Sequence, residues 1–117
     1  MHVKDGIYPA ETEEERRTVF SLRYQVYVQE LGRYKDIADH DQKMLIEDID
    51  ENSRLFYAVM DGKPVAGMRQ TWGGDAAFTR RHIDQYQLEP FLERAEAQDL
   101  LIGERLHVLP DYRGTDV

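Results

Sequence analysis

The 117-residue sequence contains no cysteine, which excludes a disulfide-stabilised scaffold, a thiol nucleophile and a thiolate metal site. The same absence is typical of proteins from reducing compartments, and we expect a cytoplasmic protein. No apolar run approaches the roughly 18 residues of a membrane span, and the first residues lack the apolar centre of a signal peptide. We therefore expect no membrane span.

Positive charge is scarce: 15 lysines and arginines face 23 aspartates and glutamates, giving a net charge of −8. A surface of this sign argues against nucleic acid or an anionic membrane as the main partner. The apolar fraction of 41% is ordinary for a globular chain, so disorder is not indicated. The length allows at most one small domain.

The first long element is a helix predicted from about residue 13 to residue 31. Thr12 and Glu15 form a capping-box pattern at its start, and Gly32 stops it. Its apolar positions share one face, and Arg23 falls in the middle of that face. Arg23 either reaches solvent, pairs with an acidic neighbour, or is a cation held at the edge of a pocket.

A β-hairpin follows, with predicted strands at 55–60 and 65–72 and a turn at 61–64. A short strand is also predicted near residues 6–8. Arg69 lies on the second hairpin strand, where it is either an exposed strand arginine or part of a substrate region. Residues 73–100 are predicted to contain helical segments before the final strand.

Between the helix and the hairpin, residues 34–52 are acidic and rich in turn-forming residues. Their spacing lacks the central glycine and the terminal glutamate of a helix–loop–helix calcium site. We therefore predict a solvated loop and no metal site.

The final strand is predicted from alternation of its side chains. One face carries Ile102, Glu104, Leu106 and Val108, and the other carries Arg105 and His107. Pro110 ends the strand, because proline cannot donate to a sheet. The glycine-bearing turn at 112–115 then presents backbone N–H groups suited to an anion.

Two segments resemble known acyltransferases. "LHVLPDYRG", residues 106–114, resembles the fourth strand and acyl-donor loop of the GNAT N-acyltransferase superfamily. "FSLRYQVYVQELG", residues 20–32, resembles the first helix of acyl-homoserine-lactone synthases and long-chain N-acyl amino acid synthases, a GNAT-like branch.

The resemblance implies an α+β fold with a mixed, mostly antiparallel sheet flanked by helices. It implies an N-acyltransferase that moves an acyl group from a thioester, on coenzyme A or acyl carrier protein, to the amine of an amino-acid-like acceptor. No permanently bound cofactor is expected. Residues 1–117 would be the N-terminal part of a single GNAT-like domain, truncated after the fourth strand, so a further chain segment or a partner would complete the fold.

The resemblance also assigns functional residues. The donor would be bound by Val108, Arg113, Gly114 and Thr115. The substrate region would contain Arg23, Asp48, Asp50, Arg69 and Arg105. Asp116 stands where the family has a motif glycine; its carboxylate disfavours coenzyme A pyrophosphate, whereas the acidic surface disfavours an acidic carrier protein.

Glu104 is our candidate for the catalytic base. On an apolar strand face a carboxylate would be desolvated, which would raise its pKa toward neutrality. In the lactone-synthase branch this strand carries a glutamate three residues before an arginine; Arg105 matches the arginine, but Ile102 occupies the glutamate position. Glu104 is therefore a displaced base or a structural ion pair, and His107 is a weaker alternative.

A second hypothesis is a non-catalytic binding or regulatory module derived from an acyltransferase. The sequence to Val117 lacks the helix after the donor loop, the fifth strand and the region that supplies the general-acid tyrosine of the family. An amphipathic helix and strand encoded after Val117 would favour the enzyme, and a stop codon the module.

Overall fold

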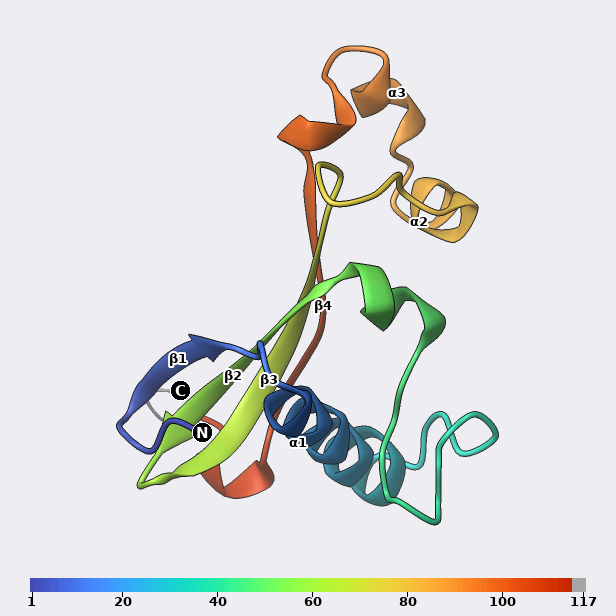
Figure 1. Cartoon of the computed structure of the whole chain (residues 1–117). Helices are drawn as coiled ribbons and strands as arrows, with labels where there is room; N and C mark the ends of the chain where they lie inside the picture. The colour runs from blue at the N-terminus through green and yellow to red at the C-terminus, as the bar shows by residue number, and fades with distance from the viewer. Residues whose placement is uncertain (115–117) are drawn as a thin grey trace.

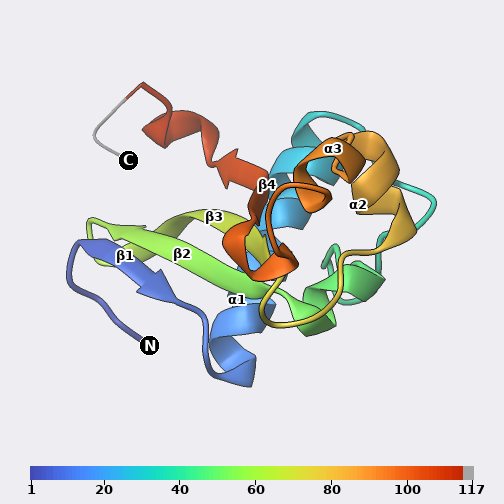
Figure 2. The same cartoon turned by 90° about the horizontal axis from the view of Figure 1, so that it is seen from above.

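In the computed structural model, which describes residues 1–114, four strands form one antiparallel sheet in the order β1-β2-β3-β4 (Figure 1). The strands are β1 (Gly6–Pro9), β2 (Arg54–Met60), β3 (Lys63–Trp72) and β4 (Leu101–Val108). Figure 2, which views the molecule from above, shows β1, β2 and β3 side by side. The predicted α+β class with a mostly antiparallel sheet is confirmed.

One long helical segment crosses the sheet. Helix α1 (Glu13–Arg23) begins at the predicted capping box: the Thr12 hydroxyl accepts from the backbone N–H of Glu15, and the Glu15 carboxylate accepts from that of Thr12, both at 3.1 Å. The helix continues as a π-helical segment, η1 (Tyr24–Glu30), in which the Leu31 N–H reaches the Val26 carbonyl five residues back. The predicted extent of the helix is confirmed. The π-helical winding of its second half was not predicted.

The main core lies between α1 and the sheet. Val19 and Phe20 of α1 are buried with Leu55, Tyr57 and Val59 of β2. The strand alternates buried and less buried side chains, as a sheet with one covered face requires. Burial of this helix face fixes which way Arg23 points.

The β2–β3 hairpin closes through two residues, Asp61 and Gly62, which both have positive φ, at 54° and 79°. This is the backbone of a primed turn, whose twist matches that of paired strands. The turn is shorter than predicted, because β3 already begins at Lys63. The face of β3 that carries Arg69 and Thr71 is buried.

The predicted insert at residues 73–100 folds at the far end of β3 and β4, away from α1 (Figure 1). It contains α2 (Arg80–Gln85), α3 (Glu89–Leu92) and a short 3-10 turn, η3 (Ala97–Asp99). Phe78 and Leu88 of the insert pack on Ile102 of β4 and form a second, smaller apolar cluster. The insert therefore has its own packing and is anchored on the last strand.

The predicted alternation of β4 is wrong after Glu104. The register between β3 and β4 shifts between Gly67 and Arg69, so that one residue of β3, Met68, lies opposite two residues of β4, Arg105 and Leu106. Arg105 adopts a φ of 56° at this bulge. An extra residue reverses the side-chain phase; Leu106 is consequently 67% exposed, and His107 turns inward and is 2% exposed.

Gly67 gives His107 its space. A Cβ atom at position 67 would lie 2.6 Å from Nε2 and 2.8 Å from Cε1 of the His107 ring. We expect Gly67→Ala to lower the free energy of unfolding by about 1–3 kcal/mol through overpacking, measured by chemical denaturation. Gly103→Ala is the control, since its Cβ would meet only the end of Met68 at 3.9 Å; equal effects of the two substitutions would contradict the prediction.

Candidate functional site

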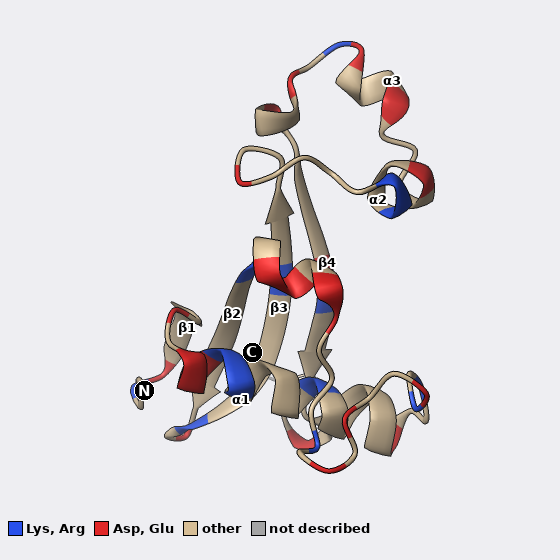
Figure 3. Cartoon of the chain, turned by 45° about the vertical axis from the view of Figure 1, so that its right-hand side comes forward, with Lys and Arg blue, Asp and Glu red and all other residues tan. Residues whose placement is uncertain are grey.

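Six charged side chains from separate segments form one hydrogen-bonded group, which we call the ion cluster. It consists of Arg23, Arg69, Arg105, Glu47, Asp50 and Glu104. Asp50 belongs to the 3-10 helix η2 (Asp48–Asn52), which Glu47 immediately precedes. Figure 3 shows this acidic segment lying over the strands β3 and β4 that carry two of the arginines.

Arg23 and Asp50 form the deepest pair of the cluster. Nη1 and Nη2 of Arg23 donate to the two carboxylate oxygens of Asp50 at 2.7 and 2.8 Å. Arg23 is fully buried, and Asp50 is 1% exposed. The interpretation that Arg23 pairs with an acidic neighbour is therefore confirmed.

Arg69 connects all three carboxylates. Its Nη1 donates to Glu47 at 3.0 Å and to Asp50 at 3.1 Å, and its Nη2 donates to Glu104 at 3.0 Å. Its side chain is fully buried, so the exposed-arginine alternative is wrong. Arg105 completes the cluster through a bidentate ion pair with Glu47, with hydrogen bonds of 2.7 and 3.0 Å.

Glu104 is held by more than arginine. Tyr86 and His82 of the insert contact its two oxygens at 2.6 and 2.7 Å. Burial raises the pKa of Glu104, but hydrogen bonds from Tyr86, Arg69 and His82 outweigh it and lower the pKa to about 2. The expected upward shift is wrong, because this strand face is not apolar once the insert is in place.

The ionised Glu104 fixes the tautomer of His82. A carboxylate only accepts hydrogen bonds, so His82 Nε2–H donates to it at 2.7 Å. Arg81 Nη2 lies 3.3 Å from the same nitrogen and cannot donate to it in this state. The other ring nitrogen of His82, Nδ1, is buried without a partner among residues 1–114.

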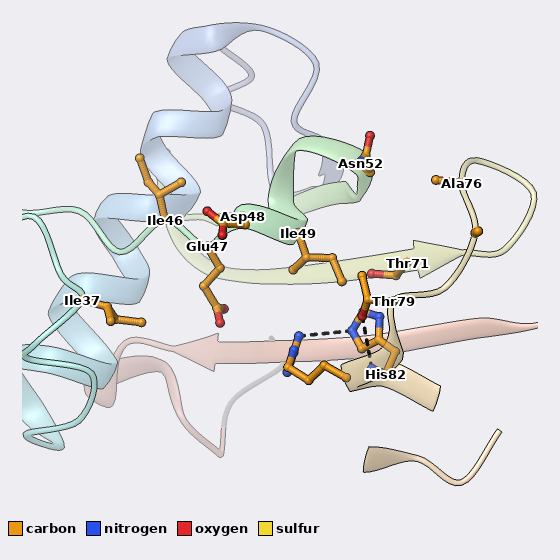
Figure 4. A pocket seen from close by; sticks show the side chains of 12 residues that line it. Ile37, Ile46, Glu47, Asp48, Ile49, Asn52, Thr71, Ala76, Thr79 and His82 are labelled. Atoms are coloured by element: carbon orange, nitrogen blue, oxygen red, sulfur yellow. Dashed lines mark hydrogen bonds between the residues drawn. The ribbon is translucent and has the colours of Figure 1, made fainter. Parts of the chain in front are cut away.

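A cleft of about 710 Å³ opens beside the cluster, between the 37–52 segment and the insert. Figure 4 shows Ile37, Ile46 and Ile49 on its first wall and Thr79 and His82 on the insert side. Its charged lining residues are Glu47, Asp48 and Arg81. Glu47 is the cluster member that reaches this cleft.

The comparison with solved structures matches the chain to a CoA-dependent acyl-homoserine lactone synthase, BjaI, whose structure was solved with MTA. The TM-score is 0.59 at 17% sequence identity, over 93% of this chain and 52% of that chain. The two proteins share a fold. No protein-family model and no curated protein matches the sequence, and the chain spans about half the length of BjaI.

On the fold shared with BjaI, the structure brings together five of the predicted site residues. They are Arg23, Asp50, Arg69, Glu104 and Arg105. Asp48 is separated from them: its side chain is exposed and lines the cleft. Asp48 and Asp50 were both assigned to the substrate region, but they lie two residues apart within one turn of η2, so their side chains point in different directions.

The predicted donor residues lie elsewhere. Val108 is half-buried and pairs with Ala66 at the end of β4. Arg113 donates from Nε to the Val108 carbonyl at 3.0 Å and forms an ion pair with Glu30. Neither they nor Gly114 line the cleft, and Thr115 lies outside the described residues.

Sequence reasoning missed the residues that complete the site. Glu47 was one acidic residue among several in residues 34–52, and nothing in its spacing distinguished it. His82, Tyr86 and Arg81 lie in the insert, 18 or more residues before Glu104 in the sequence. They contact Glu104 in space but belong to no local motif with it. Only the docking of the insert on β4 reveals them.

Within residues 1–114, no group of three or more histidine, aspartate or glutamate side chains is arranged to hold a metal ion. None of the helices described is both long enough and apolar enough to cross a membrane.

Proposed function

We propose that the protein is an N-acyltransferase that moves an acyl group from a coenzyme A or carrier-protein thioester to the amine of an amino-acid-like acceptor. The observation that carries this proposal is the ion cluster beside a cleft, on a fold shared with an acyl-homoserine lactone synthase. Burying charges costs desolvation energy that well-packed apolar side chains avoid. A chain that retains six such groups in one place is better explained by a functional site than by stability alone.

The reaction would need few groups. The amine nitrogen attacks the thioester carbonyl carbon, the C–N bond forms, the C–S bond breaks, and the thiol leaves. An acceptor that arrives as an ammonium ion must also release a proton. Holding the amine in a fixed position beside the thioester provides much of the rate enhancement.

The acidic wall of the cleft suits the ammonium group. Glu47 and Asp48 both line it, and Glu47 is held in place by Arg69 and Arg105. Hydrogen bonds from these arginines help to lower the pKa of Glu47, although burial acts in the opposite direction. Glu47 therefore remains ionised, but its charge is paired with these arginines. Asp48 is the carboxylate of this wall that is left to attract a cation.

We assign Glu104 the role of a positioning residue and not that of the catalytic base. Its contacts fasten His82 and Tyr86 of the insert to the sheet, and thereby set the second wall of the cleft. Arg23, Asp50 and Arg69 hold the opposite wall through η2. In this proposal the cluster orients the groups that touch substrate.

The donor is proposed to meet the chain at the end of β4, through Val108, Arg113, Gly114 and Thr115. This assignment is supported by the resemblance of residues 106–114 to a GNAT donor loop and by the CoA-dependence of the fold neighbour. Gly114 has a φ of 76°, which permits the tight turn that such a loop requires.

A non-catalytic module is the second candidate, and one observation favours it. Each cluster arginine has a carboxylate oxygen within 3.0 Å, so the charges of the cluster are paired without any ligand. Within the cluster, only the Nε atoms of Arg23 and Arg69 are buried without a hydrogen-bond partner among residues 1–114. A cluster that only stabilises a binding fold would look the same.

The test is an acyl-transfer assay on the protein, including any residues encoded after Val117. Acyl-CoA and acyl-carrier-protein thioesters of several chain lengths are incubated with mixed amino acids, free thiol is followed, and the amide product is identified by mass spectrometry. Thiol release that requires an amine supports the enzyme. Failure with every donor and acceptor would favour the module.

Asp48→Asn provides the matched kinetic prediction. We expect it to raise KM for the amine roughly tenfold, because a charge-assisted contact is lost, with KM for the thioester unchanged. Glu51→Gln is the control, since Glu51 lies in the same helix η2, is exposed and does not line the cleft. An equal change in both variants would mean that general surface charge, and not Asp48, attracts the amine.

A further inference from the structure

The charges of the ion cluster cancel among themselves. Three arginines face three carboxylates, and each guanidinium has a carboxylate oxygen at 3.0 Å or less. No cluster member therefore carries charge that needs a ligand. The cations and anions left for a ligand are those on the walls of the cleft.

Arg81 is the cation on these walls. Its side chain is 45% exposed, and its nearest carboxylate oxygen, on Glu104, lies 3.9 Å away, beyond hydrogen-bonding distance. That oxygen already contacts Arg69 at 3.0 Å and His82 at 2.7 Å. Arg81 contacts the neutral Gln85 at 3.1 Å, so among the described residues the long contact with Glu104 is the only ion pair of Arg81.

Asp48 is the complementary anion. Its side chain is exposed, lines the same cleft, and makes no hydrogen bond or ion pair with the described residues. The cleft thus has an unpaired carboxylate on the η2 side and an under-neutralised guanidinium on the insert side. Ile37 and Ile46, 54% and 46% exposed, add apolar surface to it.

We propose that Arg81 anchors a free carboxylate of the ligand while the acidic wall receives its ammonium group, which makes Arg81 the residue that selects zwitterionic acceptors. A guanidinium presents paired N–H groups that match the two oxygens of a carboxylate. Because α2 is fastened to Glu104 through the adjacent His82, the guanidinium is carried on a fixed element. The inference deepens the proposed function, but binding alone is sufficient to test it.

The test is calorimetric titration of the protein, without acyl donor, with three probes: L-leucine, L-leucinamide and 3-methylbutylamine. The three share an apolar group and an amine, and only leucine has a carboxylate. We expect leucine to bind at least roughly tenfold more tightly than the other two, as expected for one charge-assisted contact. Equal affinities for leucine and leucinamide would overturn the proposal, as would no binding of leucine.

Substitutions of Arg81 test whether this residue causes the preference for leucine over leucinamide. Arg81→Gln should raise the Kd for leucine roughly tenfold and leave the Kd for leucinamide unchanged, whereas Arg81→Lys should restore part of the loss. Arg80→Gln is the matched control, because Arg80 lies on the same helix but pairs with Asp84 and Glu89 and does not line the cleft. Thermal unfolding of each variant checks that the fold is intact.

The binding and acylation experiments fail in different ways. Leucine binding that depends on Arg81, in a protein that never releases thiol, would refute the acyltransferase proposal and keep the anchor. Acylation with the same preference in Arg81→Gln as in the unsubstituted protein would refute the anchor and keep the acyltransferase.

Discussion

Asp50→Asn is expected to lower the free energy of unfolding by about 3–5 kcal/mol, because it removes one partner from a buried ion pair and leaves the other charge uncompensated. Asp50 is 1% exposed and accepts hydrogen bonds from Arg23 and Arg69. Asparagine is the same size but neutral, and its amide group would turn a donor toward one of the two guanidinium groups. Equilibrium denaturation in urea measures the loss.

Asp48→Asn is the control for this effect. It makes the same chemical change two residues earlier in η2, at an exposed side chain outside the cluster, so we expect a change within about 0.5 kcal/mol. Comparing the two variants separates the effect of removing a buried, paired carboxylate from the effect of removing one negative charge from an acidic protein. Similar losses in both variants would contradict the assignment of Asp50 to a buried pair.

A double substitution tests the cause of the instability. Arg23→Met with Asp50→Leu removes both charges of the deepest pair and fills the space with apolar groups. Because replacing a buried pair by apolar residues is often close to neutral, the double variant should be more stable than Asp50→Asn, although Arg69 loses one of its partners in both. A double variant less stable than the single one would show that the pair itself stabilises the fold.

The second large effect is a loss of stability between pH 6.5 and pH 4 that depends on His107. Burial lowers the pKa of His107 from 6.5 to about 4, although its hydrogen bond to the Arg105 carbonyl acts in the opposite direction. Above pH 6.5 the imidazole is neutral in both states and does not affect stability. As the pH falls below 6.5, His107 binds a proton in the unfolded chain, whereas in the folded chain it stays neutral until about pH 4. The free energy of unfolding therefore falls by about 3 kcal/mol across this window and then becomes constant.

His107→Gln should remove this dependence, because glutamine does not titrate. The free energy of unfolding is measured at intervals between pH 7 and pH 4, and His2→Gln, which changes an exposed terminal histidine, should keep the slope. A separate loss is expected at lower pH. The pKa of Glu104 is about 2 in the fold, well below its ordinary value of 4.5, so its contribution is complete above pH 4.5 and is lost as the pH falls toward 2. A slope between pH 6.5 and 4.5 that persists in His107→Gln would contradict the assignment.

Local patterns predicted most of the elements. The capping box at Thr12 located the start of α1, and the Asp61-Gly62 turn located the hairpin. Both succeed because they depend on hydrogen bonds and backbone angles of residues adjacent in sequence. Alternation assigned Arg69 to one face of β3, but whether that face is exposed or buried stayed open until the structure showed Arg69 fully buried.

Alternation failed on β4 for a definable reason. A single extra residue at Arg105 reverses the direction of every later side chain. The conformation of Arg105 is fixed by its contact with Glu47, 58 residues earlier in the chain. No window of residues around β4 contains that partner.

The sequence by itself determined the class of fold, the helix, the hairpin and the presence of charged residues at inward positions, because these depend on neighbours along the chain. The tertiary structure alone decided which carboxylate meets which arginine. Glu104 illustrates the difference: its pKa is set by Tyr86, Arg69 and His82, which the docked insert and the neighbouring strand bring to it. Electrostatic environment depends on distances in space, and those distances exist only after the insert has packed on β4.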